Sequence, residues 1–151
     1  SSGSADTVKQ KVTKMSLSNA TENAALKMFL QGTDPSYRAG ATQYAALVSL
    51  LSPDEAAPIA SELTYTGYAR IPITKATAWT DGGSSFTNAS QFLFGKRTDA
   101  GATQQARAMV IVDTASGAIS MGIIAALNDT LDINLNIQPI FAPGDVTVTA
   151  E

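Results

Sequence analysis

The sequence predicts an all-β fold with one short N-terminal helix, arranged as an antiparallel β-sandwich of about eight strands. Two observations lead to this prediction. Apolar and polar residues alternate through Leu131–Gln138, which is typical of a strand with one buried face. Short apolar segments recur along the rest of the chain, separated by turn sequences at short intervals, and this pattern favours a sandwich.

Residues 19–31 are predicted to form the helix. Asn19 is a suitable N-cap, Glu22 follows three residues later as in a capping box, and Gly32 is a typical C-terminal stop. Three apolar residues have the i, i+3, i+4 spacing of a single stripe: Leu26, Phe29 and Leu30. We therefore expect the helix to lie against an end of the sandwich.

The middle of the chain contains two predicted strands. Tyr44–Leu51 is apolar nearly throughout, so a buried helical turn is the competing interpretation. Gly67–Thr74 is the second, and Pro72 within it indicates an edge or a bulge because proline lacks a donor for the ladder.

Aromatic residues supply further core candidates. Phe92 and Phe94 are two positions apart and should share a buried face, with Leu93 opposite. Trp79 is expected in the core because of its size.

The last third of the chain is predicted to be the centre of the fold. Ala106–Val112 and Ala118–Ala126 should form a hairpin across Asp113–Gly117. Asn128 and Asp129 should then turn the chain into the next strand. Four apolar residues of that strand are expected to be buried: Leu131, Ile133, Leu135 and Ile137. With Leu135 at its centre, Leu135→Ala should cost roughly 2–5 kcal/mol of stability.

Length and composition limit the classes of function. The chain has 151 residues, which indicates one domain, and only 15% of them are charged. A surface this low in charge suits a protein covered by partners, although a plain neutral β-domain is the alternative. The net charge is −3 without a basic cluster, and no apolar run approaches the length of a membrane helix. Neither a nucleic acid nor a membrane is an expected partner.

Catalytic chemistry has few candidate residues. The chain contains no Cys and no His, which excludes disulfides, thiolate catalysis, Cys/His zinc sites and a Ser–His–Asp triad. Most aspartates fall in predicted turns, where they accept hydrogen bonds from the backbone: Asp34, Asp81, Asp99, Asp113, Asp129 and Asp145. We expect no enzyme activity, no cofactor and no metal.

Residues 1–15 are predicted to be an N-terminal arm, and residues 16–151 a single β-sandwich domain. The arm is locally basic, with Lys9, Lys11 and Lys14, on a protein that is acidic overall. We expect the arm to be mobile in the free protein and ordered on an acidic partner surface. A frayed tail is the alternative.

Several motifs, in this order, resemble a family of small tailed-bacteriophage virion proteins. They are Leu17–Asn23, the strand Tyr44–Leu51, Glu62 ahead of Tyr65–Arg70, Trp79, Val112–Gly117 and Pro143–Val148. Members of this family are often labelled tail-fibre proteins, and some resemble the cement, or head-decoration, proteins of capsids. The resemblance covers roughly residues 16 to 151; the arm lies outside it, and Pro72 departs from it.

The resemblance implies a jelly-roll-like sandwich without enzyme activity and with a role in multimeric virion contacts. On this basis the chain is expected to be a capsid cement protein on the outer surface of the head, bridging neighbouring major capsid subunits as a dimer or trimer. A tail-fibre or host-recognition module is the alternative. The expected capsid contacts are Lys9, Lys11, Lys14, Tyr68 and Arg70. Tyr68 and Arg70 have the alternative role of stacking on and capping a sheet edge.

Overall fold

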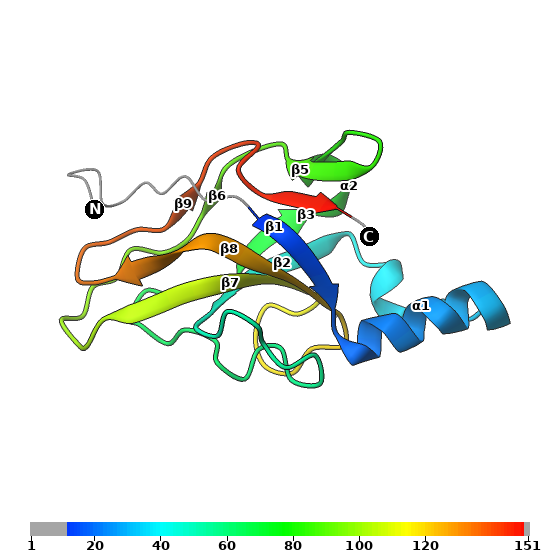
Figure 1. Ribbon diagram of the computed structural model, residues 1–151, viewed down its shortest axis with the longest axis horizontal. Coiled ribbons are helices and arrows are strands. Elements are labelled where there is room, and N and C mark those ends of the chain that lie inside the picture. The colour runs from blue at the N-terminus through cyan, green and yellow to red at the C-terminus, as the bar shows by residue number, and fades with distance from the viewer. Residues whose placement is uncertain (1–11, 150–151) are drawn as a thin grey trace.

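The computed structural model describes residues 12–149, with side chains from Ser16 onward. Within these residues ten antiparallel strands form three sheets, and a 13-residue helix, α1 (Asn19–Gln31), extends from one end (Figure 1). The predicted all-β class with a short N-terminal helix is therefore confirmed.

The largest sheet has five strands. Their spatial order is β1 (Val12–Leu17), β8 (Gly122–Ile133), β7 (Gln104–Val112), β2 (Thr42–Val48) and β3 (Ile71–Thr74). Pro72 lies in β3, at an edge of this sheet, as its missing N–H requires. The strand is shorter than predicted, because residues 67–70 precede it as a turn and irregular chain.

Two smaller sheets complete the fold. One contains β10 (Thr147–Thr149), β5 (Ser85–Asn88) and β4 (Trp79–Asp81), and the other pairs β6 (Phe92–Leu93) with β9 (Ile140–Phe141). The short helices η1 (Ser36–Arg38) and α2 (Lys75–Ala78) lie between strands. These sheets do not confirm the jelly-roll arrangement that the resemblance implied.

Strands β2 and β7 are buried on both faces. The main core packs on one face and includes Leu47, Met109 and Phe141. A second cluster on the other face includes Val48 and Val110, with Ile59 from the following loop packed against it. Since residues 45–48 of β2 are buried on both faces, this part of the strand is entirely apolar. The strand interpretation of Tyr44–Leu51 is confirmed up to Val48, where β2 ends, and Leu50 and Leu51 beyond it are exposed.

The predicted antiparallel pairing of the two segments is confirmed, because β7 pairs with β8. The second strand starts at Gly122 rather than Ala118, so the connection covers residues 113–121 instead of the predicted Asp113–Gly117. The predicted turn at Asn128–Asp129 is wrong. Strand β8 continues through these residues, and the register shifts between the pairs Ala106–Leu131 and Ala108–Ala126. Residues 127–130 thus lie opposite Arg107 alone and form a bulge in β8. The residues predicted to form a turn belong to this bulge.

The predicted burial of Leu135 is also wrong. Leu131 and Ile133 are buried as expected, but β8 ends at Ile133, and Leu135 is 45% exposed. The Asn134 carbonyl accepts a hydrogen bond from the Ile137 N–H at 3.1 Å, and Asn136 has a φ of 69°. Asparagine tolerates this left-handed conformation. The apolar–polar alternation therefore continues into a turn, where it no longer predicts which side chains are buried.

Helix α1 has the predicted bounds but a different cap and position. Ser18, not Asn19, is the N-cap, and its Oγ accepts a hydrogen bond from the Thr21 N–H at 3.3 Å. Thr21 is the helix's buried residue, and the rest of α1 points away from the sheets (Figure 1). The prediction that the stripe of Leu26, Phe29 and Leu30 packs on the sandwich is wrong, since all three are exposed.

The predictions for Phe92, Leu93 and Phe94 agree with the structure, and that for Trp79 agrees in part. Phe92 and Phe94 are buried and Leu93 is exposed, as predicted. Trp79 is only half-buried, but it packs on the core with its ring edge-on to Phe92 at 5.7 Å between centroids.

Candidate functional site

The two most distinctive motifs of the sequence meet in one buried cluster. The Arg70 guanidinium forms a two-point ion pair with Glu62, with Nε–Oε2 at 2.8 Å and Nη2–Oε1 at 2.9 Å. The same group donates to the carbonyl oxygens of Thr114 and Gly117 at 3.0 and 2.9 Å. Arg70 therefore ties residues 67–70 to the turn that joins β7 and β8.

Tyr68 completes this cluster. Its hydroxyl donates to Glu62 Oε2 at 2.6 Å and accepts from the Leu47 N–H at 3.1 Å. Burial, reinforced by the hydrogen bond to Glu62, raises the pKa of the Tyr68 hydroxyl far above its usual range. The Arg70 side chain is 3% exposed. The polar groups of both residues are thus engaged within the chain, and their predicted capsid contact stays a prediction.

A second buried arginine, Arg97, was not singled out by the sequence. It donates to Asp99 at 3.1 and 2.8 Å and to the Ile133 carbonyl at 2.6 Å. Asp99 also accepts from the Thr66 N–H at 2.8 Å. The hydrogen bond from Arg97, followed by that from Thr66, holds the pKa of the Asp99 carboxyl well below its usual range. A basic residue two positions from a turn aspartate is the signal that could have indicated this pair.

Gly67 has a steric reason to be glycine. Its φ is 104°, and a Cβ on it would lie 2.2 Å from the Lys96 carbonyl oxygen. The segments around Tyr68 and Arg97 therefore approach at backbone distance, which only glycine permits. Both arginine clusters hold loops together.

The turn aspartates also have structural roles. Asp81, Asp99, Asp113 and Asp145 each accept a hydrogen bond from a nearby backbone N–H, as predicted. Among residues 12–149, no group of three or more Asp and Glu side chains is placed to hold a metal ion. No helix in the same range is both long and apolar enough to span a membrane.

The predicted basic contacts of the arm are only partly described. Lys9 and Lys11 lie outside the described residues. Lys14 falls within β1, which pairs with β8, but only its backbone is described. Residues 12–15, assigned to the arm by the sequence analysis, thus contribute backbone to the large sheet.

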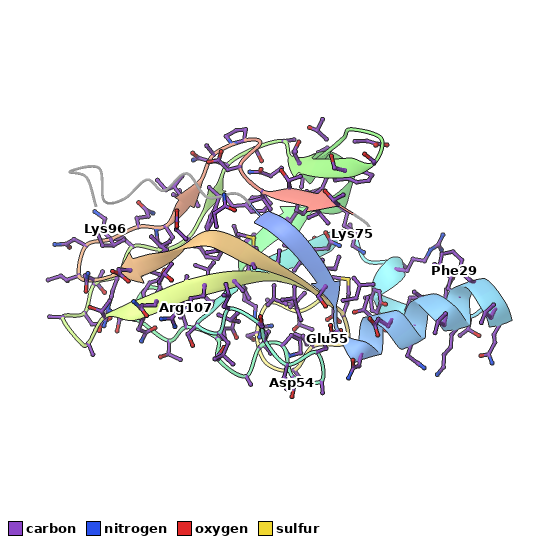
Figure 2. The ribbon with its side chains drawn as sticks, viewed as in Figure 1. Phe29, Asp54, Glu55, Lys75, Lys96 and Arg107 are labelled. Carbon is purple, nitrogen blue, oxygen red and sulfur yellow. The ribbon has the colours of Figure 1, made fainter. Side chains whose placement is uncertain are left out.

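The strongest candidate for a contact surface is the free face of α1. Leu26, Phe29 and Leu30 are 56%, 77% and 78% exposed. Phe29 lies on the part of the helix that extends from the sheets (Figure 2). The base of the helix is held firmly, because the Gly122 N–H donates to Thr21 Oγ1 at 2.8 Å. We call these three residues the α1 apolar face. Exposed apolar residues gathered on a firmly mounted element are typical of a protein–protein contact.

An apolar pocket lies elsewhere on the surface, where the three-stranded sheet crosses the large sheet. Its volume is about 230 Å³. Its apolar lining consists of Trp79, Phe86, Ile111, Ile123 and Val148. We call it the Trp79 pocket. It opens to solvent, since Phe86 is 43% exposed.

The family model described as "Podophage GP4 fiber I protein gp80" matches residues 16–149. The chain belongs to this family. It is therefore a structural protein of a phage virion, as the sequence motifs predicted. No curated protein matches the chain. The head-decoration family, which the sequence analysis placed first, is not confirmed by the match.

The family assignment agrees with the placement of the motifs. The match begins at Ser16, next to the predicted boundary of the arm, and it includes the Tyr68–Arg70 cluster. Since that cluster binds the loops of the fold to one another, the most distinctive residues of the sequence maintain its architecture.

Proposed function

We propose that this protein is a structural module of a virion fibre, which assembles through protein–protein contacts and carries out no catalysis. The family description names a fibre protein. The observation that carries the proposal is the α1 apolar face: three large apolar side chains stand in water on a helix fixed at its base. Such a surface is unfavourable unless a partner covers it.

The buried polar groups support a structural role. The two arginine clusters contain strongly shifted groups, and shifted pKa values often accompany active sites. Here each such group is used to join loops: Arg70 joins residues 67–70 to the β7–β8 turn, and Asp99 joins Arg97 to Thr66. The structural partners of these groups support an assembly role rather than catalysis.

A capsid cement protein is the second candidate. The observation that favours it is the shape of the described chain, a compact body with a single protruding helix (Figure 1), which suits a unit seated on a shell. In that role the protein would bridge neighbouring major capsid subunits on the outer surface of the head.

Gold labelling of intact particles with an antibody against this chain separates the two candidates. Label on fibres is the expected result. Label spread over the head would instead support the cement role. In that case, heads that lack the protein should lose their DNA at a lower temperature than wild-type heads. The predicted arm contacts of Lys9, Lys11 and Lys14 belong to the same comparison. A chain with all three lysines replaced by glutamine keeps residues 12–15 in β1 and should bind particles with a weaker dependence on salt.

A further inference from the structure

The Trp79 pocket combines an apolar interior with a wall of hydrogen-bond donors. Its two polar lining residues are Gln43 and Lys75, and no acidic side chain lines it. An apolar group that carries a negative charge therefore matches the pocket better than a neutral or basic group does.

Trp79 determines which atoms of Gln43 are available to a ligand. The indole N–H of Trp79 donates to Gln43 Oε1 at 3.4 Å. Because an indole nitrogen can only donate, this contact fixes the orientation of the Gln43 amide and uses its acceptor. The Nε2 group of Gln43 has no hydrogen-bond partner among the described residues. Its two N–H donors are thus left for a ligand.

Lys75 contributes a positive charge that no described acid neutralises. Its Nζ donates to the carbonyl oxygens of Tyr37 and Arg38 at 2.7 and 3.5 Å, and these contacts hold the ammonium in place. Among residues 16–149, no ion pair includes Lys75. Asp113 lines an adjoining pocket with Lys75, but its Oδ1 accepts two backbone N–H groups of the β7–β8 connection. The third N–H of half-buried Lys75 (Figure 2) therefore remains available for a carboxylate.

The size of the pocket favours a single side chain over a whole small molecule. Its volume is about 230 Å³, whereas pockets for drug-sized ligands span ~300–1,000 Å³. A cavity of roughly 150 Å³ accommodates a benzene molecule, so one phenyl or aliphatic side chain fits. Trp79 and Phe86 in the lining suit an edge or offset contact with a ring. Pockets that take one such side chain are typical of the anchor points of protein–protein interfaces.

We propose that the Trp79 pocket binds a peptide segment of another virion protein, in which a large apolar side chain is adjacent to an aspartate or glutamate. The apolar side chain fills the pocket, Lys75 pairs with the carboxylate, and Gln43 donates to a neighbouring carbonyl oxygen. This inference rests on the proposed assembly role and names the chemistry of one partner. The contact is separate from the α1 apolar face, since no α1 residue lines the pocket.

Fluorescence of Trp79 reports directly on the pocket, because it is the only tryptophan of the chain. The probes are the peptides acetyl-Gly-Phe-Asp-Gly-amide and acetyl-Gly-Phe-Asn-Gly-amide, which differ only in the charge beside the phenylalanine. We expect a saturable change with the Asp peptide and roughly fivefold weaker binding of the Asn peptide, the effect of one partly exposed ion pair. No saturable change, or equal binding of the two peptides, would overturn the proposal.

Variants test whether Lys75 causes the preference for the charged peptide. Lys75→Met should abolish the preference and Lys75→Arg should retain it, whereas Lys96→Met, at an exposed lysine outside the pocket, should leave both affinities unchanged. Phe86→Ala removes part of the apolar lining and should weaken both peptides alike.

Two outcomes of these measurements would contradict the proposal. One is a preference for the Asp peptide that persists in Lys75→Met. The other is tighter binding of free 3-phenylpropanoate than of the Asp peptide, which would assign the pocket to a small molecule. The fibre location is tested separately by labelling particles, so either conclusion can fail while the other stands.

Discussion

At the scale of single residues, the end of β8 decides which side chains hold the core. Ile133 is fully buried and its carbonyl oxygen accepts a hydrogen bond from Arg97, whereas Leu135 lies two residues later in an exposed turn. Both are branched apolar residues of equal size in the same alternating segment. They therefore form a matched pair for measuring burial.

We predict that Ile133→Ala costs about 2–5 kcal/mol of unfolding free energy, from lost burial and the cavity that remains. Leu135→Ala should change the stability by about 0.5 kcal/mol or less, as at an ordinary surface site. Urea denaturation of both variants measures the difference. Equal costs would place the end of β8 beyond Leu135.

The Arg97–Asp99 pair predicts that the folded protein loses stability at acid pH. The pKa of Asp99 is lowered in the folded protein, chiefly by the hydrogen bond from Arg97. The unfolded chain therefore takes up this proton more readily, since its aspartates titrate near pH ~4. The contribution of Asp99 to stability is fully present above that pH and is lost as the pH falls toward its lower folded pKa.

We expect the urea midpoint of the wild-type chain to fall as the pH is lowered below ~4. Asp99→Asn should lower the midpoint at neutral pH and reduce the slope of its fall in acid. Asp81→Asn, a change at the exposed end of β4, should keep the wild-type slope because Asp99 is intact. An unchanged acid slope in Asp99→Asn would show that this pair does not govern acid stability.

At the scale of elements, residues 65–70 and 94–98 are held together by a close backbone approach. Gly67 and Gly83 both have positive φ, at 104° and 93°. A Cβ on Gly83 would meet nothing within 4 Å, whereas one on Gly67 would lie against Lys96. The two glycines thus share a positive φ but differ in the space available for a Cβ.

Gly83→Ala should cost about 1–2 kcal/mol, the penalty of a left-handed conformation for a residue with a Cβ. Gly67→Ala should cost a further ~1–3 kcal/mol, because the chains must move apart. Thermal unfolding of the two variants compares them. Equal melting temperatures would contradict the close approach.

The sequence predicted the helix and strands better than it predicted how they pack against one another. The bounds of α1 follow from local signals, its periodicity and Gly32, and these were right. Its apolar stripe was assigned to the core because burial is the usual fate of such a stripe, yet α1 leaves the sheets after Thr21. The local pattern cannot indicate whether the covering surface belongs to the same chain.

Long-range pairings were equally beyond the sequence. Arg70 and the Thr114–Gly117 turn each stood out as a motif, but nothing local indicates that they bind one another across 44 residues. The predicted burial of Leu135 was wrong for a related reason. The alternation from Leu131 to Ile137 predicts which face of a strand each side chain occupies. It no longer applies after β8 ends, where Arg97 and Asn136 stabilise a turn.

At the scale of the whole molecule, the chain combines a firmly connected body with one uncovered helix. The body is closed by two buried arginine clusters and cores on both faces of the large sheet. The helix leaves its apolar face in water. Under the proposed function, the sheets provide stability and α1 provides the assembly contact.

Incorporation into particles tests this assignment most directly. Phe29→Ser and Leu135→Ser each place a polar residue at an exposed apolar site, one on α1 and one at the far end of β8. Phages carrying either variant would be purified, and copies of the protein per particle counted by quantitative mass spectrometry. The account predicts wild-type copy number for Leu135→Ser and a loss of about tenfold or more for Phe29→Ser, equivalent to ~1.4 kcal/mol of binding. Full incorporation of a folded Phe29→Ser chain would contradict it.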